Sequence, residues 1–172
     1  MKLAFAGNAG CGKTELSKYL MRRYNFKKIS FADDVKLFAR KILGRPVDKK
    51  TERRFLQIIG CGARECDSEV WIRRLDNKIF DCELNGQYNL VVDDCRFLNE
   101  AAFLRNRGFI VIKLTGRKYD LSEALANDES ERQVEMITGD YEINTGGTLA
   151  NSFMQLEIIL RSIGYVDRRR RK

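Results

Sequence analysis

Histidine is absent from this chain of 172 residues. Its absence excludes every site that needs an imidazole, including the Ser-His-Asp triad, the Cys-His dyad and His-ligated zinc. The five cysteines form no C-x-x-C pair, so reduced thiols are a better interpretation than a structural zinc site or a secreted disulfide framework. The single proline, Pro46, leaves long helices possible.

Long uncharged stretches are also missing, so no segment is expected to cross a bilayer. We therefore expect a soluble cytoplasmic protein. Hydrophobic residues make up 44% of the chain and charged residues 33%, which is typical of a globular protein and excludes a disordered one. The length suits one domain with a sizeable core.

The formal net charge is +8, and half of it comes from the last six residues, 167–172, which contain five cations and one anion. Such a tail could bind nucleic acid electrostatically, although a disordered, solubilising terminus has the same composition. The modest positive surplus of the remaining chain suits an anionic ligand.

Apolar runs and helical periodicity alternate along the chain. Strands are expected over 2–6, 26–31, 88–94, 109–114 and 141–143, and helices over 14–23, 34–43, 99–107 and 149–163, with further helical residues across 51–80. A polar, charged segment covers 115–139. Strands that alternate with helices predict an α/β fold with a largely parallel sheet, formed by one domain over 1–166.

A phosphate-binding pattern follows the first expected strand. The pattern G-x-x-x-x-G-K-[ST] is matched at every fixed position by Gly7, Asn8, Ala9, Gly10, Cys11, Gly12, Lys13 and Thr14. Its glycines let backbone N–H groups face phosphate oxygens, Lys13 reaches the β- and γ-phosphates, and the Thr14 hydroxyl can bind magnesium. Because the pattern lies between an expected strand and an expected helix, it predicts binding of a nucleoside triphosphate rather than a chance glycine turn.

Two pairs of aspartates follow expected strands. Asp93 and Asp94 end the clearest buried strand, where an acid can bind magnesium, although solvated turn aspartates are also common there. Asp33 and Asp34 follow the second strand, and one of them could accept a hydroxyl proton. Taken alone, that second pair is better interpreted as the N-cap of a helix.

Arginines are numerous enough to hold an anionic donor and acceptor together. Arg54, Arg64 and Arg96 could clamp an acceptor phosphate, and Arg117, Lys118 and Arg132 could belong to a lid over the phosphates. Exposed helix faces and loops carry the same residues. Trp71 is interpreted first as a core residue and second as a base-stacking one.

Taken together, four stretches resemble the deoxynucleoside monophosphate kinases of bacteriophages, a branch of the P-loop nucleoside monophosphate kinases. They are the phosphate loop, S-F-A-D-D-V-K at 30–36, F-L-Q-I-I-G-C-G-A-R at 55–64 with Trp71 downstream, and V-V-D-D-C-R-F-L-N-E at 91–100. Weaker likenesses are L-S-E at 121–123 and N-T-G at 144–146. The chain lacks the histidine of the family's H-x-S-E lid pattern, and the basic tail has no counterpart there.

The resemblance implies a P-loop kinase fold, with a five-stranded parallel sheet flanked by helices. It also implies a helical acceptor-binding insertion at about 44–86 and a lid at about 115–139. ATP and Mg²⁺ would form the donor complex, and a deoxynucleoside monophosphate would be the acceptor. A phage origin, and hence the cytoplasm of a host cell, is suggested by this likeness alone. A monomer or a homodimer is expected.

Site residues follow from the same resemblance. Asp33 would lie beside the acceptor, and Gln57, Arg64, Trp71 and Arg96 would line the acceptor pocket. Asp94 becomes a better magnesium candidate than Asp93, with Thr14 as the second metal ligand, and Asn144 and Gly146 would lie near the donor adenine. Lys13, Arg96 and the lid cations Arg117 and Arg132 would stabilise the transferred phosphoryl group.

The expected reaction is transfer of the ATP γ-phosphate to the 5′-phosphate of a deoxynucleoside monophosphate. The first alternative is another small-molecule kinase, such as one for dephospho-coenzyme A, in which Asp33 would serve as the base for a sugar hydroxyl. The second is a nucleotide-gated ATPase that binds nucleic acid through residues 168–172.

Overall fold

The computed structural model describes residues 1–48, 51–116 and 129–165. The chain divides into two compact units, which we name the sheet unit (Met1–Lys28 with Gln87–Lys172) and the helical unit (Ile29–Gly86). The tail at 167–172 and residues 117–128 of the expected lid, which include Arg117 and the L-S-E stretch at 121–123, lie outside the described residues.

Among the described residues, five strands form one sheet: β1 (Lys2–Ala6), β2 (Lys27–Ile29), β3 (Leu90–Cys95), β4 (Ile110–Thr115) and β5 (Tyr141–Asn144). Their spatial order is β2-β3-β1-β4-β5. The central strand β1 pairs in parallel with β3 and β4, and β4 pairs in parallel with β5. Leu3, Ala4, Phe5 and Ala6 are fully buried, as expected of a parallel strand that is covered on both faces.

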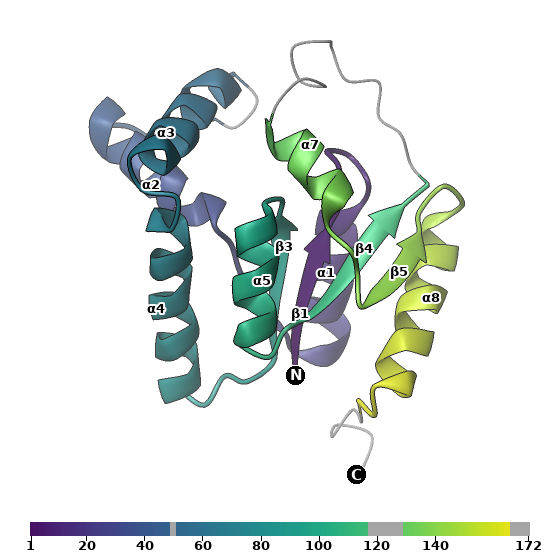
Figure 1. The fold of residues 1–172 in the computed structure, drawn as a ribbon. Coiled ribbons are helices and arrows are strands. Elements are labelled where there is room, and N and C mark those ends of the chain that lie inside the picture. Colours follow the sequence, from purple (N-terminus) through teal and green to yellow (C-terminus); the bar gives the residue numbers. More distant parts are fainter. Residues whose placement is uncertain (49–50, 117–128, 166–172) are drawn as a thin grey trace. The chain divides into compact units, whose positions relative to one another are not determined.

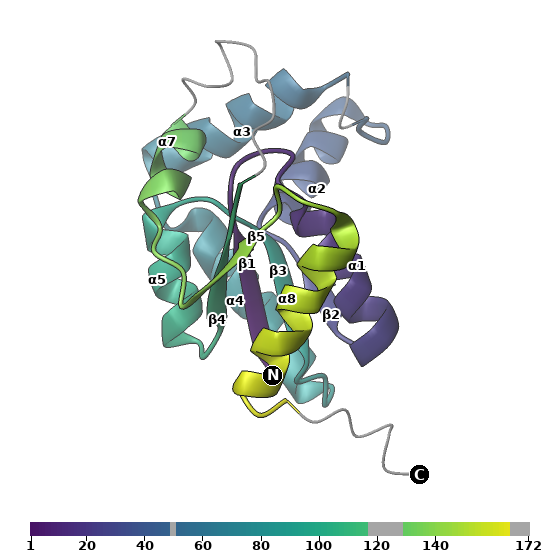
Figure 2. The same cartoon turned by 90° about the vertical axis from the view of Figure 1, so that its right-hand side faces the viewer.

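Helices cover both faces of the sheet within the sheet unit. They are α1 (Lys13–Tyr24), α5 (Leu98–Asn106), α7 (Glu129–Met136) and α8 (Leu149–Ser162). Figures 1 and 2 show α1 and α8 side by side on one face and α5 on the other. The core between α1, α8 and the sheet contains Leu16, Leu20, Ile112, Ile143 and Leu156. The predicted α/β fold with a five-stranded parallel sheet is confirmed.

Parallel pairing brings the carboxyl ends of the strands to the same edge of the sheet. The glycine-rich loop follows β1 there, Arg96 follows β3, and Gly116 and Thr145 follow β4 and β5. The sheet topology therefore gathers four segments that lie far apart in the sequence.

The charged segment at 115–139 contains a helix that the sequence did not indicate. Helix α7 buries only Glu131 and Val134, so it lacks the apolar periodicity by which amphipathic helices are recognised. Two acidic residues in its first turn, Glu129 and Glu131, favour the helix through its dipole. The other expected elements are present with ends shifted by a few residues, and the helical stretch at 51–80 proves to be two helices.

The helical unit consists of α2 (Ala32–Leu43), α3 (Arg53–Cys66) and α4 (Val70–Leu84). Helix α3 packs against both α2 and α4. Trp71 of α4 is only 3% exposed, and its indole N–H donates to the carbonyl of Gly60 on α3 at 3.0 Å. This hydrogen bond and the burial of the ring favour the interpretation of Trp71 as a core residue.

Two adjacent aspartates at the start of α2 have different environments. The helix begins at Ala32 after Phe31, so the expectation that an aspartate forms its N-cap is wrong. The Asp34 carboxylate is buried and forms ion pairs with Arg74 Nε at 2.9 Å and Lys78 Nζ at 2.5 Å on α4. Asp33 is half-exposed, and its carboxylate lies 3.7 Å from Lys36 Nζ. Asp34 thus links α2 to α4, whereas Asp33 is left accessible.

The ionisation of Asp34 contributes to stability. Burial raises the pKa of Asp34, but hydrogen bonds from Lys78 and Arg74 outweigh that effect and hold the pKa below its ordinary value of 3.8. The unfolded state therefore binds a proton before the folded state does. The resulting stabilisation is present above the unfolded pKa and is lost as pH falls through the folded pKa.

None of the helices in the described part of the chain is both long and apolar enough to span a bilayer.

Replacement of Asp34 by Asn is expected to lower the free energy of unfolding by about 1–2 kcal/mol at neutral pH, because it leaves two partly exposed cations without their anion. Urea denaturation of the wild type and D34N, repeated as the pH is lowered below 3.8, would measure this loss and its decrease in acid. The matched control is D33N, which should change stability by less than about 0.5 kcal/mol. Equal effects of the two substitutions would contradict the assignment of Asp34.

Candidate active site

The glycine-rich loop after β1 is held against the end of β4. Gly7 has a φ of +154°, and a Cβ there would lie 2.7 Å from Cys11 Sγ and 3.0 Å from the carbonyl oxygen of Leu114. Only glycine fits this close approach without displacing its neighbours. Gly12 is the N-cap of α1, so the loop leads directly into the helix, as phosphate binding requires.

Lys13 is a buried cation at the base of this loop. Only 8% of the residue is exposed, and its ammonium donates to the carbonyls of Gly7 and Asn8, the latter at 2.8 Å. Burial lowers the pKa of Lys13 from its ordinary value of 10.5, with Arg96 acting in the same direction and Cys11 and Glu131 against it. A desolvated ammonium of this kind favours a nearby anion, so the loop fits a phosphate group.

The two aspartates of β3 are not equivalent. Asp93 is 5% exposed, and its carboxylate forms an ion pair with Lys28 Nζ on β2 at 2.7 Å. Asp94 is half-buried at the carboxyl edge of the sheet, and Thr14 is exposed at the start of α1. Oxygen atoms of a carboxylate and a hydroxyl suit Mg²⁺, so Asp94 and Thr14 remain the magnesium candidates.

Arg96 stands at a turn that a buried carboxylate maintains. Glu100, which is 2% exposed, accepts hydrogen bonds from the backbone N–H groups of Arg96 at 3.0 Å and Phe97 at 3.2 Å. These donors belong to the start of α5, where such N–H groups lack helical partners. The Arg96 side chain forms an ion pair with Glu131 on α7.

Glu131 is a site residue that the sequence did not indicate. Its carboxylate is 5% exposed and accepts from the Ala9 N–H of the glycine-rich loop at 3.1 Å as well as from Arg96. One turn further along α7, Glu135 accepts from the side-chain amide of Asn8 at 3.3 Å. No local pattern in the sequence signals this role, because its two partners lie 122 and 35 positions away along the chain. Arg132 is exposed on the same helix.

The segments after β4 and β5 hold each other in place. The Asn144 side-chain oxygen accepts from the Gly146 N–H at 2.8 Å, and Thr145 donates to the Thr115 carbonyl through its N–H and its hydroxyl. Gly116 has a φ of +87°, and a Cβ there would lie 2.1 Å from the Asn144 side-chain oxygen. The Asn144 side chain therefore shapes this turn, while its role toward an adenine stays a prediction.

The residues predicted for the acceptor all belong to the helical unit, apart from Arg96. Asp33 is half-exposed on α2, and Gln57 and Arg64 are half-buried and seven residues apart on α3, which places them on one face. Arg64 donates to the Gly60 carbonyl one turn earlier at 3.2 Å. Lys13 and Arg96, in contrast, are close enough within the sheet unit for Arg96 to influence the pKa of Lys13.

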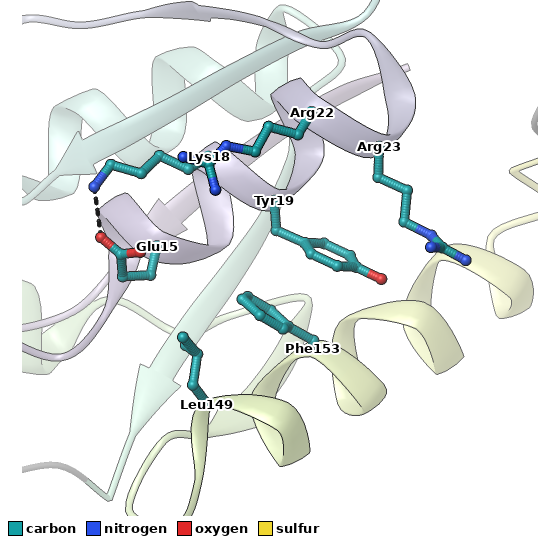
Figure 3. A pocket seen from close by; sticks show the side chains of 7 residues that line it. All are labelled: Glu15, Lys18, Tyr19, Arg22, Arg23, Leu149 and Phe153. Carbon is teal, nitrogen blue, oxygen red and sulfur yellow. Dashed lines mark hydrogen bonds and ion pairs between the residues drawn. The ribbon is translucent and has the colours of Figure 1, made fainter.

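A hollow of about 520 Å³ lies between α1 and α8 (Figure 3). It is lined by Glu15, Lys18, Tyr19, Arg22, Arg23, Leu149 and Phe153. The rings of Tyr19 and Phe153 stack with centroids 4.3 Å apart, and Lys18 pairs with Glu15 at 2.7 Å. No residue predicted for the site lines this hollow, so it belongs to the packing of the two helices.

A curated viral protein is similar in sequence to this chain. The chain is 28% identical over 148 residues to the uncharacterized protein ORF77 of Ictalurid herpesvirus 1 (strain Auburn), a match that covers 86% of this chain and 65% of that protein. The chain thus spans just under two thirds of that relative's length. No protein-family model matches the sequence.

Three solved kinase structures have a fold similar to that of this chain. Dephospho-CoA kinase from Campylobacter jejuni matches with a TM-score of 0.56 and 17% identity over 95% of this chain and 98% of that one. Shikimate kinase from Bacteroides thetaiotaomicron matches with a TM-score of 0.52 and 15% identity over the same shares. A sugar kinase from Janibacter sp. HTCC2649 matches with a TM-score of 0.56 and 12% identity over 95% of each chain. The chain therefore shares its fold with these three kinases.

Proposed function

We propose that this protein is a kinase that transfers the γ-phosphate of ATP to the 5′-phosphate of a deoxynucleoside monophosphate. The observation that carries the proposal is the buried Lys13 ammonium beneath a glycine-rich loop, with Arg96 nearby, in a P-loop kinase fold. The four sequence stretches that resemble phage deoxynucleoside monophosphate kinases support this acceptor over the sugars and shikimate of the structural neighbours.

The donor would bind to the sheet unit. Loop N–H groups and Lys13 would hold the β- and γ-phosphates, and the turn at Asn144 and Gly146 would lie near the adenine. Thr14 and Asp94 would hold Mg²⁺, which neutralises charge on the phosphates when it is bound.

The chemistry of this acceptor requires little from the protein. An oxygen of the acceptor phosphate attacks the γ-phosphorus, the bond from that phosphorus to the β-bridging oxygen breaks, and ADP leaves. Since the attacking oxygen is already anionic, no general base is needed. The absence of histidine from this chain is therefore compatible with the mechanism. Lys13 and Arg96 would act by positioning and by stabilising negative charge, joined by the lid cations Arg117 and Arg132.

The acceptor would bind to the helical unit. Arg64 has the guanidinium that a phosphate prefers, and Gln57 on the same face of α3 can hydrogen-bond a base or sugar. Asp33, left accessible while its neighbour Asp34 is committed to Arg74 and Lys78, would contact the acceptor directly. Trp71 would act indirectly by fixing α3 through Gly60.

A second candidate is a kinase whose acceptor is a sugar hydroxyl, as in dephospho-coenzyme A. The half-exposed Asp33 carboxylate favours it, because a neutral hydroxyl needs a base of this type. The fold similarity to dephospho-CoA kinase is compatible with either acceptor.

Release of ADP from ATP and Mg²⁺ should depend on at least one of the four common deoxynucleoside monophosphates, each added singly beside dephospho-coenzyme A. Lys13→Ala should lower kcat by about 10²–10³ because it removes a cation that stabilises the transferred phosphoryl group, with the thermal midpoint little changed. The matched control is Lys18→Ala, which removes an exposed lysine from the same helix and should keep full activity. ATP hydrolysis that ignores every acceptor would refute the kinase proposal.

Asp33→Asn separates the two acceptor classes. With a nucleotide phosphate as acceptor, it should raise the acceptor KM by about tenfold and leave kcat nearly unchanged, because only a binding contact is lost. With a hydroxyl acceptor, kcat should fall by about 10²–10⁴ because the base is lost. Steady-state kinetics with both acceptors would decide, and a fall in kcat for the nucleotide would contradict the mechanism proposed above.

A further inference from the structure

An acidic helix lies against the glycine-rich loop, although the loop has the features of an anion site. Helix α7 bears Glu129, Glu131 and Glu135. Glu131 accepts a hydrogen bond from the loop residue Ala9, and Glu135 accepts one from the loop residue Asn8. Negative side chains beside bound phosphates would repel them. Their presence therefore needs a physical reason.

The Glu131 carboxylate makes the contacts that a phosphate would make. One of its oxygens accepts from the backbone N–H of Ala9 at 3.1 Å, and the other accepts from the guanidinium of Arg96. A loop N–H and an arginine are the two kinds of donor that such a site offers to a phosphoryl group. With 5% of the residue exposed, the carboxylate is also largely shielded from water, which strengthens both contacts.

We propose that Glu131 is a built-in competitor for the phosphate position, so that binding of a polyphosphate displaces its carboxylate from Ala9 and Arg96. The inference rests on the proposed function, since it concerns the donor side of the same site. The carboxylate neutralises Arg96 and lies near the buried Lys13 ammonium. Displacement would free the Arg96 guanidinium to bind the phosphate. Binding of the donor and release of Arg96 from Glu131 would therefore be coupled.

The competition lowers the apparent affinity for phosphates by the fraction of molecules in which the carboxylate is released. Glu131→Gln preserves the size of the side chain and removes its charge. We expect E131Q to bind inorganic pyrophosphate and ATP about tenfold more tightly than the wild type in titration calorimetry, as expected for the loss of one charge-assisted hydrogen bond. Equal or weaker binding by E131Q would overturn the proposal and would indicate that the carboxylate stays in place to position Arg96.

The matched control is Glu129→Gln. Glu129 is exposed on the same helix, and its carboxylate accepts from the Gln133 side chain at 2.8 Å. E129Q changes the net charge by the same amount, so its affinity for pyrophosphate should stay within about twofold of the wild type. An equal gain in E129Q and E131Q would overturn the proposal, because it would assign the effect to overall charge.

A measurement on the wild type covers the case in which E131Q does not fold. The ¹³C resonance of the Glu131 side-chain carboxylate should shift when pyrophosphate saturates the protein, since the carboxylate loses two donors. An unchanged resonance at saturation would overturn the inference. Acceptor-dependent turnover tests the proposed kinase function separately, so either proposal can fail alone.

Discussion

Burial of the Lys13 ammonium is the constraint on which the arrangement of the site depends. A desolvated cation must be surrounded by acceptors or anions, and the loop supplies the carbonyls of Gly7 and Asn8 for this purpose. Within the same loop, Gly7 approaches Cys11 and the end of β4 more closely than a side chain would allow. The loop conformation, the parallel sheet and the burial of this cation are thus aspects of one packing problem.

Charge balance extends this constraint to neighbouring elements. Arg96 adds a second cation near Lys13, and Glu131 of α7 supplies the anion that compensates it. Glu100 is also a buried carboxylate, but it accepts hydrogen bonds from backbone N–H groups at the start of α5. These hydrogen bonds fix the turn that carries Arg96. The Glu100 carboxylate therefore maintains the backbone, and the Glu131 carboxylate pairs with Arg96 and with the N–H of Ala9.

The sequence supported a good prediction of the fold, whereas the roles of the site residues stay predictions. Strands and most helices were recognised because their apolar residues recur with the right period, but α7 was missed because its buried residues are Glu131 and Val134. The Asp33-Asp34 pair shows the same limit. The two aspartates are adjacent in the sequence, so the local pattern does not distinguish them. The positions of Arg74 and Lys78 on α4 make Asp34 the buried, ion-paired residue and leave Asp33 accessible.

The sequence by itself determined the α/β class and the phosphate loop, because both depend on local patterns: alternating apolar segments, and glycines and a lysine at set spacings. Tertiary structure decided which charged side chains are paired. Asp93 with Lys28, Asp34 with Lys78, and Arg96 with Glu131 join residues from separate elements, so no local pattern records them. Electrostatic interactions depend on distance in space and on burial, and both arise only when the strands and helices have packed.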